Sequence, residues 1–405
     1  MDYYNEIYNY ANTIQTVDCH SHFGSPEVPK HYGISDLIRE SYVCWSGEQF
    51  DENNLESIQQ FIHRVKYTNS FLNLQDAVNE LYGISRIDIH TWNEIDEAIK
   101  AHNRNEDYRK RLKRQCGLMK VILDAYWKPG YNHDMEDIFS SAFRIDPLLF
   151  GYDYTKRDHD NNSAGDLLHG KFTDIDSYCA ATKALIAEKV SKGSVVVKCA
   201  SAYDRGLDFK RHTREAANAV FEKQTYDSND IKAFQDYLMY EICGFLAEID
   251  IPIQIHTGLG CMHRTNAMWL RDLICENNNT KFILLHGSIP WNEDVLALAF
   301  SYWNVYTDVT WLPVLSPAIL ENYLTRLIEM GMAERIIWGS DAWTVEETYG
   351  ALKIMKETLA KVLEKYLKCN QIDMEDAKEL VRKVLYKNAQ RIFFDKDRSM
   401  ELSDI

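Results

Sequence analysis

Two histidines near the start of the chain, His20 and His22, are the first residues whose types and spacing could do chemistry. They stand two residues apart at the end of a short strand-like run over residues 14–18. Alternate residues of a β-strand point to the same face, so both imidazoles can converge on one point. This spacing predicts a pair of metal ligands, with Asp18 on the same face able to orient one imidazole. The alternative is a pair of strand-end histidines bonded to nearby backbone.

Four other strand-like runs also end in a metal-binding or titratable side chain, namely Lys198, His256, His286 and Asp341. Apolar residues precede each of them, so each is expected to leave a buried strand at the same edge of a sheet. The structural alternatives are satisfied core histidines, an N-cap for Asp341, and an ion pair between Lys198 and a carboxylate such as Asp341. Five strand ends of this kind favour a single site in which Asp341 is a metal ligand or a general base.

Three further residues close to strand ends, Arg144, Tyr203 and Arg205, are candidates for binding a substrate. A guanidinium group can hold a carboxylate through two parallel hydrogen bonds, so Arg144 or Arg205 could clamp an acidic substrate. Each could equally be part of a structural salt bridge.

Strand-like runs alternate with long helical patterns along the chain, which predicts βαβ units around a parallel sheet. We count eight runs, at residues 14–18, 118–124, 139–145, 195–198, 252–256, 282–286, 305–308 and 336–341. Eight such units predict an α/β fold, a (β/α)₈ TIM barrel, spanning residues 1–405 as a single domain. The stretch of residues 28–116 is too long for one crossover helix. It predicts a helical insertion after the first strand, and we expect this insertion to cap one mouth of the barrel. Residues 157–165 are expected to form a loop, residues 349–394 to be helical, and the acidic tail to be disordered.

Composition narrows the class of protein. The formal net charge of the 405 residues is −16, which argues against nucleic acid as a partner. The sequence has no apolar run long enough to span a membrane, and its polar start does not resemble a signal peptide. Nine scattered cysteines without a Cys-x-x-Cys pair indicate reduced thiols in a cytoplasmic protein, most of them small core residues.

The ordered set of strand-end residues resembles the amidohydrolase superfamily, which carries His-x-His on its first strand and Asp on its eighth. The closer resemblance is to the amidohydrolase-related branch that includes the nodulin-like domains attached to glutamine synthetases. It rests on residues 198–207, 254–258 and 385–393. Asp204 departs from it, because an arginine is expected beside the tyrosine. The long insertion is also similar to that of uronate isomerases, members of the same superfamily.

The resemblance implies a divalent metal, most often zinc. A one-metal site held by His20, His22, His256 and Asp341 and a two-metal site bridged by carboxylated Lys198 both stay open.

The leading hypothesis is a metal-dependent hydrolase that opens an amide, ester or lactone of a small carboxylate-bearing substrate. Asp341 would accept a proton from the metal-activated water and pass it to the leaving group. His286 would bind the carbonyl oxygen or a second metal. Isomerisation of a uronate or non-oxidative decarboxylation on the same site is the alternative. A non-catalytic binding protein that retains the metal is the alternative from another class. The expected partner is a small-molecule substrate, and self-association into a homo-oligomer is left open.

Overall fold

In the computed structural model, eight strands form one parallel sheet whose order follows the chain from β1 to β8 and which curls into a nearly closed barrel. The structure describes residues 2–24, 31–105 and 108–395. It describes the side chains of these residues except those of residues 104, 105, 108 and 109. The strands are β1 (Thr16–Ser21), β2 (Leu118–Leu123), β3 (Phe139–Arg144), β4 (Ser194–Cys199), β5 (Ile253–His256), β6 (Phe282–Leu285), β7 (Val305–Asp308) and β8 (Ile336–Ile337). The (β/α)₈ fold predicted from the sequence is therefore confirmed.

The chain divides into two compact units. The first comprises the residues up to Val121 together with Val309–Thr325 and Trp338–Lys387; the second comprises Ile122–Asp308, Arg326–Ile337 and the described residues from Asn388 onward.

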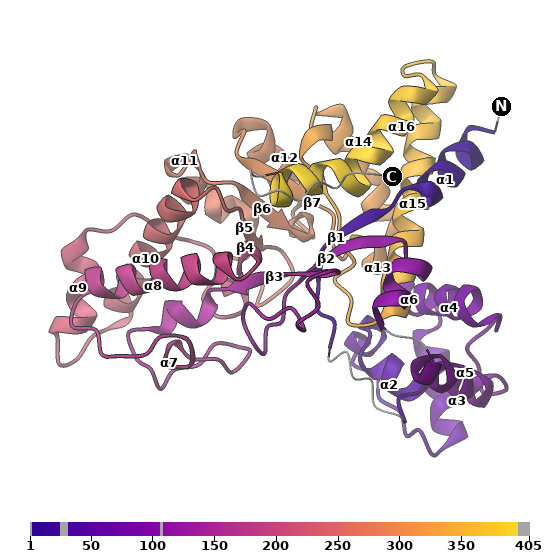
Figure 1. Ribbon diagram of the computed structural model, residues 1–405, viewed down its shortest axis with the longest axis horizontal. Coiled ribbons are helices and arrows are strands. Elements are labelled where there is room, and N and C mark those ends of the chain that lie inside the picture. The colour runs from indigo at the N-terminus through magenta and orange to yellow at the C-terminus, as the bar shows by residue number, and fades with distance from the viewer. Residues whose placement is uncertain (1, 25–30, 106–107, 396–405) are drawn as a thin grey trace. The chain divides into compact units, whose positions relative to one another are not determined.

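Helices of the first unit come from both ends of the chain. They are α1 (Tyr3–Thr13), α2 (Ile34–Arg39), η1 (Tyr42–Ser46), α3 (Leu55–Val65), α4 (Asn69–Tyr82), α5 (Trp92–Asn105), α6 (Tyr108–Gln115), α13 (Leu312–Leu315), α14 (Pro317–Glu329, which continues into the second unit), α15 (Val345–Lys368), α16 (Met374–Arg382) and η7 (Lys383–Lys387). Figure 1 shows α1 and α15, indigo and yellow, side by side.

The helices between β1 and β2 have an apolar core of their own. Ile34, Phe61, Leu74 and Ile95, from four different helices, are buried together in it. Helix α4 packs closely on α15, where a Cβ on Gly350 would meet the carbonyl oxygen of Asn73 at 2.7 Å. A glycine is therefore required at that crossing, and it fixes these helices against α15.

The second unit contains strands β3 to β8 and the helices that connect them. These are η2 (Asp146–Phe150), α7 (Ala164–Leu167), α8 (Ile175–Ser191), η3 (Ser201–Tyr203), α9 (Arg214–Glu222), α10 (Ser228–Glu248), η4 (Ala267–Leu270), α11 (Arg271–Glu276), η5 (His286–Ser288), α12 (Asn292–Ser301), η6 (Ala333–Arg335) and η8 (Gln390–Phe394). Adjacent strands pair in parallel, as in the register of Gln254 with Ile283. The strand interiors are buried, which explains their near-continuous apolar sequences.

Two strands differ from their predicted limits by more than one residue at an end. The first begins at Thr16 and continues through Ser21, so His20 lies within the strand and His22 just beyond it. The last strand ends at Ile337, because the following residues leave the regular ladder while still bonding to β1. The predicted acidic tail after Asp395 lies outside the described residues, as does the predicted start of the insertion at residue 28. No helix among the described residues is long and apolar enough to cross a membrane.

Candidate metal centre

His20, His22 and Asp341 meet in one buried cluster within the first unit. Oδ1 of Asp341 lies 3.3 Å from Nε2 of His20 and 3.3 Å from Nε2 of His22. All three residues are at most 8% exposed. Two ring nitrogens and one carboxylate oxygen thus lie close together, and their binding of a metal stays a prediction.

Backbone pairing between β1 and the segment after β8 creates this cluster. The Asp341 N–H donates to the His20 carbonyl at 2.9 Å, and the His22 N–H donates to the Ala342 carbonyl at 2.8 Å. A Cβ on Gly339 would lie 2.8 Å from the backbone nitrogen of His20, so only glycine permits this approach. Asp341 itself has φ of 60°, a left-handed conformation that is uncommon outside glycine and often marks functional positions.

The donor set fits a divalent metal. Oδ1 of Asp341 is buried and accepts no hydrogen bond from the described residues, which would be costly without a cation to face it. Nitrogen and oxygen ligands about 2.0–2.2 Å from a tetrahedral zinc lie roughly 3.3–3.6 Å from one another. The 3.3 Å separations match that spacing. Oδ1 of Asp341 thus lies at ligand spacing from each of the two imidazoles.

Asp18 supports this cluster through backbone and hydroxyl groups. Its carboxylate accepts the N–H groups of His20 and Ser340, at 3.2 Å and 3.1 Å, and the hydroxyl of Ser21 at 2.8 Å. Complete burial raises its pKa to about 6 against the opposing effect of these hydrogen bonds. Asp18 thus ties β1 to the segment that carries Asp341, in addition to any effect on an imidazole.

Tyr42 is a site residue that the strand-end pattern could not reveal. Its hydroxyl donates to Oδ2 of Asp341 at 2.5 Å, and it comes from η1 in the insertion. Its ring packs against Trp45, Trp311 and Trp343 at centroid distances of 5.0, 5.2 and 4.9 Å. Trp343 also stacks on His22 at 5.3 Å. The insertion therefore supplies a hydrogen bond to Asp341 and two of the aromatic rings beside the cluster, those of Tyr42 and Trp45.

Glu347, in the first turn of α15, binds the backbone of Tyr42. Its Oε1 accepts the Tyr42 N–H at 2.8 Å and its Oε2 accepts the Trp343 N–H at 3.3 Å. Burial raises the pKa of Glu347 to about 8 despite these two bonds. Sequence reasoning missed this residue too, because it looks like an ordinary first-turn glutamate of a helix.

His256 and His286 form a second buried pair, within the second unit. The ring of His256 donates from Nε2 to the Leu259 carbonyl at 2.5 Å, and its Nδ1 accepts from Nε2 of His286 at 3.0 Å. Burial, reinforced by the charge of Lys198, holds the pKa of His256 well below its usual range. His256 is therefore neutral, and in this arrangement both of its ring nitrogens are engaged in hydrogen bonds. Metal ligation by His256 stays a prediction that requires one of these bonds to open.

Other predicted residues surround this pair. Lys198 is 1% exposed at the end of β4. The ring of Tyr203 lies 4.5 Å from His256 and 4.8 Å from His159. His159 was not predicted to act; its Nδ1 bonds to the Asp204 carboxylate at 2.8 Å, within the loop expected at residues 157–165.

Both candidate clamp arginines are engaged in ion pairs. Arg144 donates to Asp124 at 2.5 Å and pairs with Asp160. Arg205 pairs with the buried Asp236 at 2.7 Å. The salt-bridge alternative thus describes both residues as they stand, while their contact with a substrate stays a prediction.

Residues 199–394 match the family model described as "Amidohydrolase". A curated protein similar to this chain is "Protein fluG" of Emericella nidulans, 26% identical over 239 residues. The match covers 54% of the chain but only 28% of that relative's length. The predicted likeness to glutamine-synthetase-associated domains is supported only weakly by it.

Solved structures share the fold along almost the whole chain. A uronate isomerase of Thermotoga maritima aligns with a TM-score of 0.79 at 15% identity, covering 97% of both chains. A glucuronate isomerase of Caulobacter crescentus gives 0.79 at 13% identity, covering 98% of this chain and 95% of that one. A protein described as a metal-dependent hydrolase from Lactobacillus casei gives 0.67 at 17% identity, covering 96% and 97%. At these identities the likeness shows a shared fold, and the aligned coverage includes most of the insertion.

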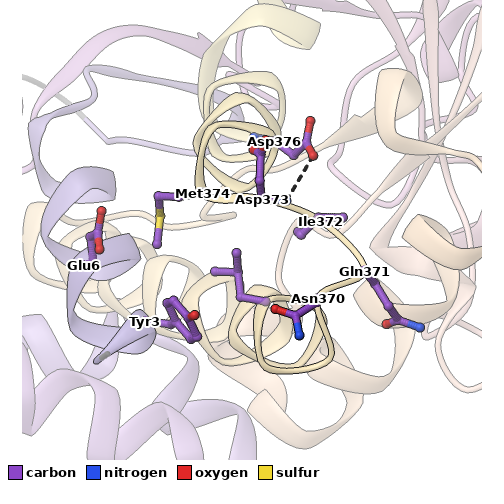
Figure 2. Close-up of a pocket in the computed structure, with 9 residues that line it drawn as sticks. Tyr3, Glu6, Asn370, Gln371, Ile372, Asp373, Met374 and Asp376 are labelled. Carbon is purple, nitrogen blue, oxygen red and sulfur yellow. Dashed lines mark hydrogen bonds between the residues drawn. The ribbon is translucent and has the colours of Figure 1, made fainter.

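A surface pocket of about 590 Å³ lies where α1 meets the turn between α15 and α16. Figure 2 shows Tyr3 and Glu6 on one side of it and Asn370 and Asp373 on the other. It contains none of the predicted site residues.

Proposed function

We propose that the protein is a metal-dependent hydrolase that cleaves an amide, ester or lactone bond of a small carboxylate-bearing substrate. The observation that carries this proposal is the buried Oδ1 of Asp341, without a hydrogen bond among the described residues and 3.3 Å from two imidazole nitrogens. In this proposal His20, His22 and Asp341 hold the metal, and zinc suits their nitrogen and oxygen donors.

A divalent metal bound there would supply Lewis-acid polarisation of a carbonyl and a water of lowered pKa. Asp341 keeps its second oxygen, Oδ2, for proton transfer, and the Tyr42 hydroxyl orients that oxygen. The neighbouring aromatic rings, with Trp311 and Tyr42 at 4% and 5% exposure, keep bulk water from this side of the carboxylate. Asp341 can therefore accept a proton from water and return it to the leaving group.

The remaining predicted residues belong to the same proposal. His256 and Lys198 would complete a one-metal or two-metal centre, and His286 would bind the carbonyl oxygen or the second metal. Arg144, Tyr203 and Arg205 would orient the substrate carboxylate, with the arginines exchanging part of their present ion pairing for it.

Metal analysis joined to activity tests this proposal. Purified protein should contain one or two equivalents of a divalent ion, and a chelator should abolish turnover of an N-acyl amino acid, ester or lactone panel. Adding zinc back should restore that turnover. Full activity of the metal-stripped protein would contradict the proposal.

Isomerisation of a uronate is the second candidate, and the Tyr42–Asp341 pair favours it. Moving a proton between neighbouring carbons needs a base and an acid held close together, which a carboxylate and a hydroxyl 2.5 Å apart provide. The whole-chain likeness to two uronate isomerases supports the same reading. A panel of uronates assayed beside the hydrolase panel separates the two activities.

Two other hypotheses about the function, both made from the sequence, stay as alternatives. Non-oxidative decarboxylation would be detected with a benzoate panel. A non-catalytic binding protein would take up metal and bind a ligand tightly without turnover. The proposal also includes a cytoplasmic location, for which the support is that no disulfide joins any of the nine cysteines, all of which the structure describes. The oligomeric state stays open.

A further inference from the structure

The start of α15 has the sequence of a capping box but uses its glutamate differently. Thr344 and Glu347 stand three residues apart, and Thr344 Oγ1 accepts the Glu347 N–H at 3.2 Å. In a capping box the glutamate would reach back to the backbone N–H of the capping threonine. In this structure its two oxygens instead accept the N–H groups of Tyr42 and Trp343.

These two bonds join segments that are far apart in the chain. Tyr42 lies 305 residues before Glu347, in the insertion, whereas Trp343 closely follows Asp341 at the barrel strand end. One carboxyl group thus fixes the backbone of the residue whose hydroxyl binds Asp341, together with the backbone close to Asp341. Glu347 is only 4% exposed. Burying a carboxyl group costs free energy unless hydrogen bonds compensate for the lost water, and these two bonds do so.

The neighbouring glutamate has a separate attachment to the insertion. Glu346 accepts hydrogen bonds from Arg111 in α6 and from Tyr82 in α4. Those contacts hold the helices of the insertion on α15, whereas Glu347 contacts Tyr42 itself. The insertion as a body and the placement of Tyr42 therefore depend on different side chains.

We propose that Glu347 is a positioning residue that sets Tyr42 on Asp341, so that the insertion aligns the carboxylate of the metal cluster. The proposal deepens the proposed function and rests on it for the role of Asp341. Because the hydrogen bonds run from Glu347 to the Tyr42 backbone and from the Tyr42 hydroxyl to Asp341, the effect of Glu347 passes through Tyr42.

Hydrogen–deuterium exchange of the full-length protein tests the placement without any substrate. In Glu347→Ala the peptide containing residues 41–47 should exchange at least about tenfold faster, because the Tyr42 N–H loses its acceptor. Thr344→Ala is the matched control, since it weakens the same helix cap without touching Tyr42. Equal exchange of this peptide in Glu347→Ala and wild type would overturn the proposal.

A double-mutant cycle tests the route to Asp341. Glu347→Gln and Tyr42→Phe should each alter the visible spectrum of the cobalt-loaded protein, and the double variant should match Tyr42→Phe alone. On whichever substrate panel is turned over, Glu347→Gln should lower kcat about tenfold with KM within about twofold, and should add nothing when Tyr42→Phe is already present. If the effects of the two substitutions on kcat multiply in the double variant, the proposal is wrong. If the wild-type protein turns over no substrate of any panel, the proposed function is wrong. The exchange rates and the cobalt spectra then still test the positioning role of Glu347.

Discussion

The Tyr42 hydroxyl donates a hydrogen bond to Oδ2 of Asp341 at 2.5 Å, although 299 residues separate the two in the chain. Asp341 thereby faces the insertion through one oxygen and, through the other, His20 in β1 and His22 just beyond it. A carboxylate placed in this way can bind a metal and move a proton without changing its position.

Removing this hydroxyl in Tyr42→Phe should lower kcat by about 10–100-fold, because a hydrogen bond to a charged group contributes about 1.5–3 kcal/mol. The phenyl ring keeps its contacts with the surrounding tryptophans, so metal content and fold should persist. Steady-state kinetics with metal analysis checks this. Tyr67→Phe, at a residue 82% exposed, is the control, and an unchanged kcat in Tyr42→Phe would show that the hydroxyl has no part in the reaction.

Removing a ligand should act on the metal first. His22→Ala and Asp341→Asn should each weaken metal binding by at least about 100-fold, since even residues behind a ligand contribute 10–100-fold. Both variants should lose turnover while circular dichroism shows a retained fold. Metal titration measures the effect, with the exposed His263→Ala as the control. Wild-type metal affinity in Asp341→Asn would remove Asp341 from the ligand set.

Glu347 should make the stability of metal-free protein depend on pH. Its pKa is raised from 4.5 to about 8 in the folded state, so the folded protein binds more protons than the unfolded chain between these values. Stability must then fall as pH rises through this window, by up to about 1.4 kcal/mol per pH unit. Urea unfolding at pH 5, 6, 7 and 8 should show this loss in wild type relative to Glu347→Gln. Parallel pH profiles for the two proteins would contradict it.

Arg144 should prove essential for stability. Arg144→Met removes the guanidinium group that pairs with the buried Asp124 and with Asp160, which should cost about 3–5 kcal/mol in free energy of unfolding. Arg157→Ala breaks an exposed pair with Asp166 and should cost at most about 1 kcal/mol. Denaturant unfolding of both variants gives the comparison. A stable Arg144→Met with a raised KM would instead favour a role confined to the substrate.

The sequence by itself determined the barrel and the cluster of its first and last strands. Strand periodicity and apolar runs are local properties, and parallel strands bring their carboxyl ends to one edge, so His20, His22 and Asp341 could be predicted to meet. Tertiary structure alone decided which groups surround them. Tyr42 reaches Asp341 only because the insertion packs on α15, and Glu347 leaves its local capping role because it accepts a distant backbone N–H instead. Likewise, whether Arg144 pairs with Asp124 or stays free depends on the burial of both, a property of packing that no spacing along the chain encodes.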